Sequence, residues 1–179
     1  MMHKIRIAGS GGQGILIAGV ILGKAASVYD GLWATQTQSY GPEARGGASK
    51  TDVIISDTEI NYPFIGTCDI LVCLSQLAYT KYAGGIVPGG TRIVDPDLVV
   101  HHADDCIPIN ASATAIELEN PLVANMVMLG ALSRLYPVVS GRALEEAISH
   151  SVSKRFVDID IEALHRGMAL AESLGTGEV

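Results

Sequence analysis

The chain has 179 residues, a length typical of one globular domain, and we expect a single domain over residues 1–179. Hydrophobic residues make up 48% of it, which is enough for a substantial core and excludes a largely disordered protein. The formal net charge is −7 and the 12 Lys and Arg residues are scattered, which disfavours nucleic-acid binding. Only 17% of residues are charged, as in a densely packed α/β domain or a subunit partly covered by partners.

No targeting or membrane-spanning segment is predicted. The apolar run from Ile15 to Leu22 is interrupted by Gly19 and follows a glycine-rich segment, which is typical of neither a signal peptide nor a membrane span. We therefore expect a cytoplasmic protein that does not contact a membrane. The three cysteines contain no C-x-x-C pair, so they predict buried reduced thiols and neither a disulfide framework nor a metal site: Cys68, Cys73 and Cys106.

The N-terminal segment has the pattern of a strand, a glycine turn, a helix and a second strand. Residues 3–8 alternate as a strand and stop at the glycines of residues 9–14. Residues 15–28 are then apolar and alanine-rich over the length of a helix. Residues 32–37, with β-branched and aromatic side chains, predict the second strand.

A loop and a β-hairpin are predicted next. Residues 39–47 contain four glycine or proline residues in nine, which excludes a helix or a central strand. Residues 49–56 alternate as a strand, turn at residues 57–58 and resume at residues 59–62. This pattern predicts an inserted hairpin after the second strand.

The rest of the chain alternates between strands and helices and ends in helices. The continuous apolar run of residues 68–74 is typical of a central parallel strand. Further expected elements are a helix at 76–82, a turn at 87–90, strands at 91–94 and 106–109, and helices from 111, at 122–135, at 142–149 and at 160–174. Pro121 and Ser140 stand where helices begin. Together the elements predict an α/β fold with a mostly parallel, Rossmann-like sheet, flanking helices and an inserted β-hairpin.

The most informative local motif is the glycine turn after the first strand. Residues 9–14 read Gly-Ser-Gly-Gly-Gln-Gly and satisfy G-x-G-x-x-G between a strand and a helix. Such a turn can hold a phosphate or diphosphate at the helix N-terminus, or it can permit close packing of the helix or of a neighbouring subunit. Thr37-Gln38-Ser39 supplies no carboxylate for a ribose, which disfavours NAD, and no G-K-[ST] follows, which excludes a P-loop.

A second glycine-rich loop carries an arginine. In the segment from Tyr40 to Gly47, Arg45 could bind a carboxylate or a phosphate through two hydrogen bonds. It could instead pair with Glu43 or contact another subunit. Both loops follow strands, so we expect them at one edge of the sheet.

Residues for conventional catalysis are not evident. His101-His102 stand in a polar stretch with Asp104-Asp105, which is typical of a solvated loop, and Ser75 lacks a G-x-S-x-G frame. We expect neither catalytic residues nor a metal site in this chain.

These motifs resemble the gamma subunit of 2-oxoacid:ferredoxin oxidoreductases, over nearly the whole chain. The S-Y-G-P-E-x-R-G-G form is most similar to the 2-oxoglutarate branch, and the pyruvate and 2-oxoisovalerate branches stay open. The likeness rests on these segments: Gly9 to Gly14, Gln38 to Gly47, Asp52 to Ser56, Cys68 to Leu74, Pro88 to Gly90 and Asn125 to Gly130. The chain departs from the family near its C-terminus, where Asp160 stands in a segment that often has an asparagine.

The resemblance implies an accessory subunit, inactive alone, of a complex that converts a 2-oxoacid and coenzyme A to acyl-CoA, CO2 and reduced ferredoxin. Thiamine diphosphate, Mg and [4Fe-4S] clusters would belong to partner alpha and beta subunits and a ferredoxin-like delta subunit, with ferredoxin as acceptor. This chain would hold no cofactor stably by itself. The residues that match the family's two loops could lie near coenzyme A or contact a neighbouring subunit: Gly9, Gly11, Gly12, Gln13, Gly14, Tyr40, Arg45, Gly46 and Gly47. The competing interpretation is a stand-alone nucleotide-binding Rossmann-like oxidoreductase.

Overall fold

The computed structural model describes residues 1–39, 47–101 and 106–175 of the chain. Its strands are β1 (Met2–Ser10), β2 (Trp33–Gln38), β3 (Ala48–Ser56), β4 (Cys68–Cys73), β5 (Ile86–Val94) and β6 (Ile107–Pro108). Its α-helices are α1 (Ile15–Lys24), α2 (Gln76–Tyr82), α3 (Ala111–Glu117), α4 (Ala124–Leu135), α5 (Gly141–Ser149) and α6 (Val157–Gly175). A π-helical turn, η1 (Ala25–Tyr29), extends α1, and short 3-10 turns are η3 (Ala83–Gly85), η5 (Pro121–Val123) and η6 (Lys154–Phe156).

Within the described residues the strands form one six-stranded sheet in the order β2-β3-β1-β4-β5-β6. The pairs β1–β4, β4–β5 and β5–β6 are parallel, whereas β3 is antiparallel to both β1 and β2. Only β3 therefore runs against the other strands. The expected mostly parallel sheet with flanking helices is confirmed.

Two local predictions are wrong. Residues 59–62 form no strand, and β3 finds its antiparallel partners in β1 and β2. The predicted turn at residues 87–90 lies inside β5. Gly89 has a φ of 78° there, which interrupts the regular strand geometry without ending the strand. The register between β4 and β5 shifts at this place, between Cys68 and Ile70.

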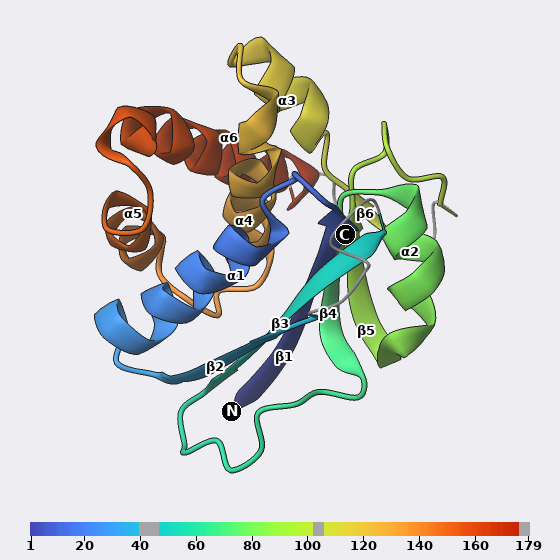
Figure 1. The fold of residues 1–179 in the computed structure, drawn as a ribbon, viewed down its shortest axis with the longest axis vertical. Helices are drawn as coiled ribbons and strands as arrows, with labels where there is room; N and C mark the ends of the chain where they lie inside the picture. The colour runs from blue at the N-terminus through green and yellow to red at the C-terminus, as the bar shows by residue number, and fades with distance from the viewer. Residues whose placement is uncertain (40–46, 102–105, 176–179) are drawn as a thin grey trace.

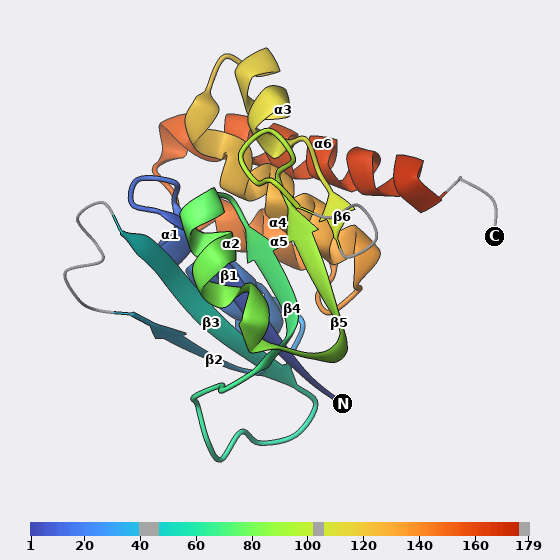
Figure 2. The ribbon, with the colours of Figure 1, turned by 90° about the vertical axis from the view of Figure 1, so that its right-hand side faces the viewer.

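The alternation of each strand sends its side chains into two separate cores. One core lies under α1, α4, α5 and α6 and takes Ile5, Ile7, Ile70 and Val72 from the sheet. The other lies under α2 and takes Ala8, Leu71 and Cys73. Figures 1 and 2 show this unequal division, with α2 alone on its side of the sheet and the other long helices opposite.

The helix beginnings agree with the sequence. Ser140 caps α5 by accepting a hydrogen bond from the Ala143 N–H at 3.1 Å, and Pro121 stands in the first turn of η5. The segment from Ala124 to Ser133 is buried on every side, as its apolar pattern predicts. No helix within the described residues is long and apolar enough to cross a bilayer.

Two glycines let α4 and α6 cross in close contact. A Cβ on Gly130 would collide with the carbonyl oxygen of Leu164, and a Cβ on Gly167 would collide with that of Val127. Only hydrogen at these positions leaves room for the opposite backbone. The crossing fixes α6 against α4, and so fixes the helix that closes one side of the candidate site.

Candidate functional site

The glycine turn connects the carboxyl end of β1 to the N-terminus of α1. Gly11 and Gly12 are exposed, and Gly12 and Gly14 have φ of 90° and 67°, a conformation that favours glycine. Gly14 is the N-cap of α1, and within the described residues no side chain caps this end of the helix. The turn therefore presents a helix N-terminus, with its partial positive charge, at the carboxyl edge of the sheet.

Gln13 ties the turn to the neighbouring strand. Its Oε1 accepts a hydrogen bond from the Ser10 N–H at 2.7 Å, and its Nε2 donates one to the carbonyl oxygen of Leu74, also at 2.7 Å. Leu74 directly follows β4, so the side chain links the ends of β1 and β4. A Cβ on Gly9 would lie 2.6 Å from Gln13 Oε1, so this glycine is needed for the contact. Gln13 thus has a structural role in the described chain.

Asn125 fastens the other side of the turn. Its Nδ2 donates a hydrogen bond to the Gly14 carbonyl oxygen at 3.1 Å, and its Oδ1 accepts one from the Met126 N–H at 2.9 Å. Asn125 is 4% exposed. No sequence motif marks Asn125 as a site residue. A lone amide in a long apolar helix is nevertheless a signal, because a buried polar side chain needs partners.

The C-terminal flank of the second loop lies beside the glycine turn. Ser10 is paired with Ala48, and the Ser49 hydroxyl donates a hydrogen bond to the Gly9 carbonyl oxygen at 3.3 Å. Gly47 is half-buried beside them. The remaining predicted residues of this loop, and the proposed partner of its arginine, lie outside the described residues: Tyr40, Glu43, Arg45 and Gly46.

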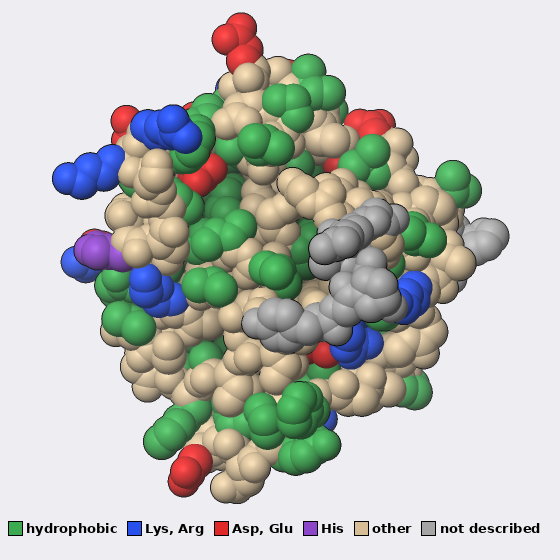
Figure 3. Space-filling model, viewed as in Figure 1, with side chains coloured by type: hydrophobic (Ala, Val, Ile, Leu, Met, Phe, Trp, Pro, Cys, Tyr) green, Lys and Arg blue, Asp and Glu red, His purple; other side chains and the backbone are tan. Residues whose placement is uncertain are grey.

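A pocket of about 250 Å³, here called the glycine-turn pocket, opens beside the turn. Its walls come from the glycine turn and α1, from η5 and α4, and from the segment that leads into α6. In the space-filling view, hydrophobic side chains gather in the hollow between α1 and the start of α6 (Figure 3). The lining residues are Gly12, Gly14, Ile17, Asn120, Leu122, Val123, Asn125, Met126, Val152, Phe156 and Asp160.

Asp160 is the charged residue among those that line the pocket. It lies in the first turn of α6 and is 8% exposed. Burial raises the pKa of its carboxyl to about 6. The lining residues include no Lys or Arg. An anion in this pocket would therefore meet the helix N-terminus of α1 and also a buried acidic group.

The side chains of the described residues do not form a metal or cluster site. No group of three or more His, Cys, Asp or Glu residues among them is arranged to hold a metal ion. The three cysteines are buried, and burial raises the pKa of Cys68 and raises that of Cys73 to about 12. The three cysteines do not gather with other metal-ligating side chains within the described residues, so this part of the chain offers no set of ligands for an iron–sulfur cluster. His102, Asp104 and Asp105 lie outside the described residues.

Comparison with known proteins assigns the chain to a family. The family described as pyruvate ferredoxin/flavodoxin oxidoreductase matches residues 4–170. The 2-oxoglutarate synthase subunit KorC of Methanothermobacter marburgensis is 50% identical over 95% of this chain and 97% of its own length. KorC of Methanocaldococcus jannaschii is also 50% identical, over 97% of this chain and 96% of its own.

Two solved structures agree closely with the fold. The gamma subunit of a keto/oxoacid ferredoxin oxidoreductase from Geobacter sulfurreducens has a TM-score of 0.87 and 41% identity, over 97% of this chain and 98% of that chain. A 2-oxoglutarate:ferredoxin oxidoreductase from Magnetococcus marinus has a TM-score of 0.87 and 29% identity, over 96% of this chain and 31% of that chain. The chain therefore belongs to the pyruvate ferredoxin/flavodoxin oxidoreductase family.

Proposed function

We propose that the chain is the gamma subunit of a 2-oxoglutarate:ferredoxin oxidoreductase complex. The observation that carries this proposal is the 50% identity to two KorC subunits of 2-oxoglutarate synthase over nearly the full length of both chains. The match to the Geobacter gamma subunit, at 41% identity, supports the same role. These relatives do not favour a stand-alone nucleotide-binding oxidoreductase.

The reaction of the complex would convert 2-oxoglutarate and coenzyme A to succinyl-CoA and CO2, and two electrons would reduce ferredoxin. Thiamine diphosphate, Mg and the [4Fe-4S] clusters would be held by alpha, beta and ferredoxin-like delta subunits. No group of three or more His, Cys, Asp or Glu residues in the described part of the chain is arranged to hold a metal, which supports placing the clusters in the partner subunits. The cytoplasmic location and the single domain stay predictions.

The role of this chain in the complex would be structural, with a contribution to the entry of coenzyme A. The Magnetococcus enzyme was solved with 2-oxoglutarate, coenzyme A and succinyl-CoA bound, and one region of that chain resembles this one. The exposed glycine turn could approach a phosphate through its backbone N–H groups. Because Asp160 lies close by and the residues that line the pocket include no Lys or Arg, we infer that Arg45 of the second loop would add positive charge for a phosphate.

Gentle anaerobic purification of the tagged chain from its native cells tests the function. We expect larger subunits to co-purify, with brown cluster absorbance near 400 nm and dye reduction that requires both 2-oxoglutarate and coenzyme A. Pyruvate and 2-oxoisovalerate serve as comparison substrates and identify the branch. A colourless protein without partners that carries a nucleotide would overturn the proposal.

Exchange of Arg45 for alanine separates a ligand role from an interface role. If Arg45 binds a phosphate of coenzyme A, the KM for coenzyme A rises about tenfold or more while the complex stays assembled. Lys50→Ala is the control, since Lys50 pairs with Asp52 at 2.6 Å and belongs to a different ion pair. If assembly weakens instead, Arg45 is an interface residue, and if neither changes, the loop has no part in coenzyme A entry.

A further inference from the structure

Asp160 lies on the wall of the glycine-turn pocket without a partner among the described residues. The residue is 8% exposed, and no hydrogen bond or ion pair reaches its side chain from the part of the chain that the structure describes. Because the carboxylate faces the pocket, a donor that enters the pocket can replace solvent as its hydrogen-bond partner, and a cationic donor gains most from a group that is already largely desolvated. The raised pKa of about 6 has the same cause, and at neutral pH the group is still mostly ionised.

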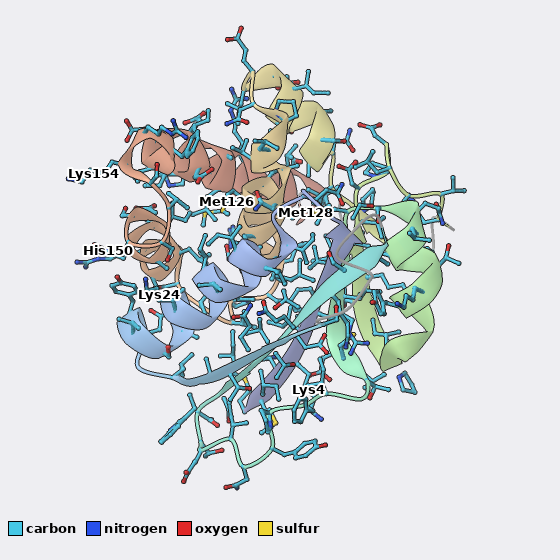
Figure 4. The ribbon with its side chains drawn as sticks, viewed as in Figure 1. Lys4, Lys24, Met126, Met128, His150 and Lys154 are labelled. Carbon is cyan, nitrogen blue, oxygen red and sulfur yellow. The ribbon has the colours of Figure 1, made fainter. Side chains whose placement is uncertain are left out.

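The described groups around the carboxylate do not supply this donor. Arg155 lies over the ring of Phe156, 4.5 Å from its centroid, and Lys154, in η6, points away from the molecule (Figure 4). Asn125 already bonds Gly14. The N-terminal end of α6 favours the negative charge of Asp160 but provides no hydrogen bond to it.

The lining of the glycine-turn pocket is complementary to a long cationic side chain. Its walls are the apolar surfaces of Ile17, Met126 and Val152, and the carboxylate of Asp160 is its charged group. At its edge Leu122 is 69% exposed and Phe156 is 38% exposed, so apolar surface surrounds the opening. Lysine and arginine combine an apolar stem with a charged end, which matches apolar walls around one carboxylate.

We propose that the glycine-turn pocket receives a lysine or arginine side chain of a neighbouring subunit, whose cationic group pairs with Asp160. The proposal rests on the proposed function, because it requires the chain to work inside a complex. Charge complementarity selects this occupant: the unpaired group is an anion, and the chain as a whole carries a formal net charge of −7. Exposed apolar residues around a desolvated charge are typical of the central contact of a subunit interface.

This contact would also place the partner directly against the glycine turn. Gly12 and Gly14 line the same pocket as Asp160, so an inserted side chain would lie beside the N-terminus of α1. The neighbouring subunit would then determine how the two glycine loops face the rest of the complex. Asp160 would act as a positioning residue and not as a catalytic one.

The test compares Asp160→Asn with Asp158→Asn, an exposed acid in the same turn of α6. Each purified chain is titrated against the complex from which this subunit has been removed, and the dissociation constant is measured. Asp160→Asn should bind at least about thirtyfold more weakly, as loss of one member of a buried charge pair predicts. Asp158→Asn should stay within about threefold of the wild type.

Thermal unfolding of the isolated chains separates an interface role from a structural one. If Asp160 serves the interface, Asp160→Asn melts at or above the wild-type temperature, because it removes an unpaired buried charge. A lower melting temperature together with unchanged affinity per folded chain would mean that the carboxylate stabilises this chain alone, and would overturn the proposal.

A photo-crosslinking amino acid in place of Leu122 identifies the occupant within the assembled complex. We expect the cross-linked peptide to come from another subunit and to contain a lysine or arginine. A peptide without a basic residue, or equal affinity of wild type and Asp160→Asn, would refute the pocket contact and leave the proposed function standing. Failure of the wild-type chain to bind any larger subunit would refute the proposed function and this contact together.

Discussion

The two faces of the sheet bury charge in different ways. Beneath α2, Arg6 and Asp52 are 5% and 4% exposed and pair through two hydrogen bonds of 2.7 and 2.9 Å. Lys50 donates a third hydrogen bond to Asp52. The Arg6 guanidinium also lies 5.6 Å from the centroid of the Tyr82 ring, in a cation–π contact. On the face under the longer helices the core is aliphatic, and Asp160, at its border, is unpaired within the described residues.

The difference shows which buried charged groups find their partners within the described chain and which do not. Burial lowers the pKa of Arg6, but the hydrogen bond and charge of Asp52 outweigh it, and the pKa is raised overall. The Arg6–Asp52 pair is thus satisfied without any other molecule. Asp160 lacks this compensation, so we expect a partner on the side of the sheet that carries it.

The largest expected effect is on the paired side. Asp52→Ala leaves the Arg6 guanidinium buried without its carboxylate, so the free energy of unfolding should fall by about 3–5 kcal/mol. Urea unfolding measures it. Glu172→Ala is the control, because its pair with Arg134 is more than half exposed and should contribute less than about 1 kcal/mol. Equal losses in the two variants would contradict the assigned difference between buried and exposed pairs.

A somewhat smaller effect is expected where the helices of the aliphatic side cross. Gly130→Ala places a methyl group against the Leu164 carbonyl oxygen, so α4 and α6 must separate, at a cost of about 2–3 kcal/mol. Gly23→Ala makes the same change in α1, where no atom lies within 4 Å of the new Cβ. That variant should gain up to about 1 kcal/mol from helix propensity. Unfolding midpoints compare the two, and a stabilised Gly130→Ala would refute the close crossing.

The smallest effect concerns the unpaired acid and depends on pH. Because the pKa of Asp160 is raised to about 6 from an ordinary value of 3.8, the folded chain holds more protons than the unfolded chain between these values. Stability of the isolated chain should therefore fall as pH rises from about 4 to about 6, by about 1–2 kcal/mol from this group. Asp160→Asn should remove that part of the fall in urea midpoints measured across the range. Parallel pH profiles of the two chains would show that the carboxyl is not buried as described.

The sequence predicted the parts of the fold that depend on local pattern. The continuous apolar run of residues 68–74 predicted a central strand covered on both faces, and Ile70 and Leu71 lie in the two different cores. Ser140 marked the start of α5. The pairing of β3 was not predictable in this way, because a strand pattern does not name its neighbours. Residues 59–62 have a strand pattern but form no strand. The chain leaves β3 by a turn in which Ser56 Oγ accepts a hydrogen bond from the Thr58 N–H.

The candidate site was predicted in part for a similar reason. The glycine turn is a contiguous motif, and its place between a strand and a helix follows from its neighbours in the sequence. The pocket instead joins Gly12, Asn125 and Asp160, which are far apart along the chain and meet only because α4 and α6 cross closely. Only packing in three dimensions shows that the acid near the C-terminus faces the turn near the N-terminus.

The reversed strand also sets the order in which the sheet can be built during synthesis. β2 pairs with β3 and with no other described strand, and on that side of the sheet β1 also depends on β3. A nascent chain that has released only β1, α1 and β2 therefore holds two strands that do not pair with each other. Emergence of β3 joins them at once, and β4, β5 and β6 can then be added outward in the order in which they leave the ribosome.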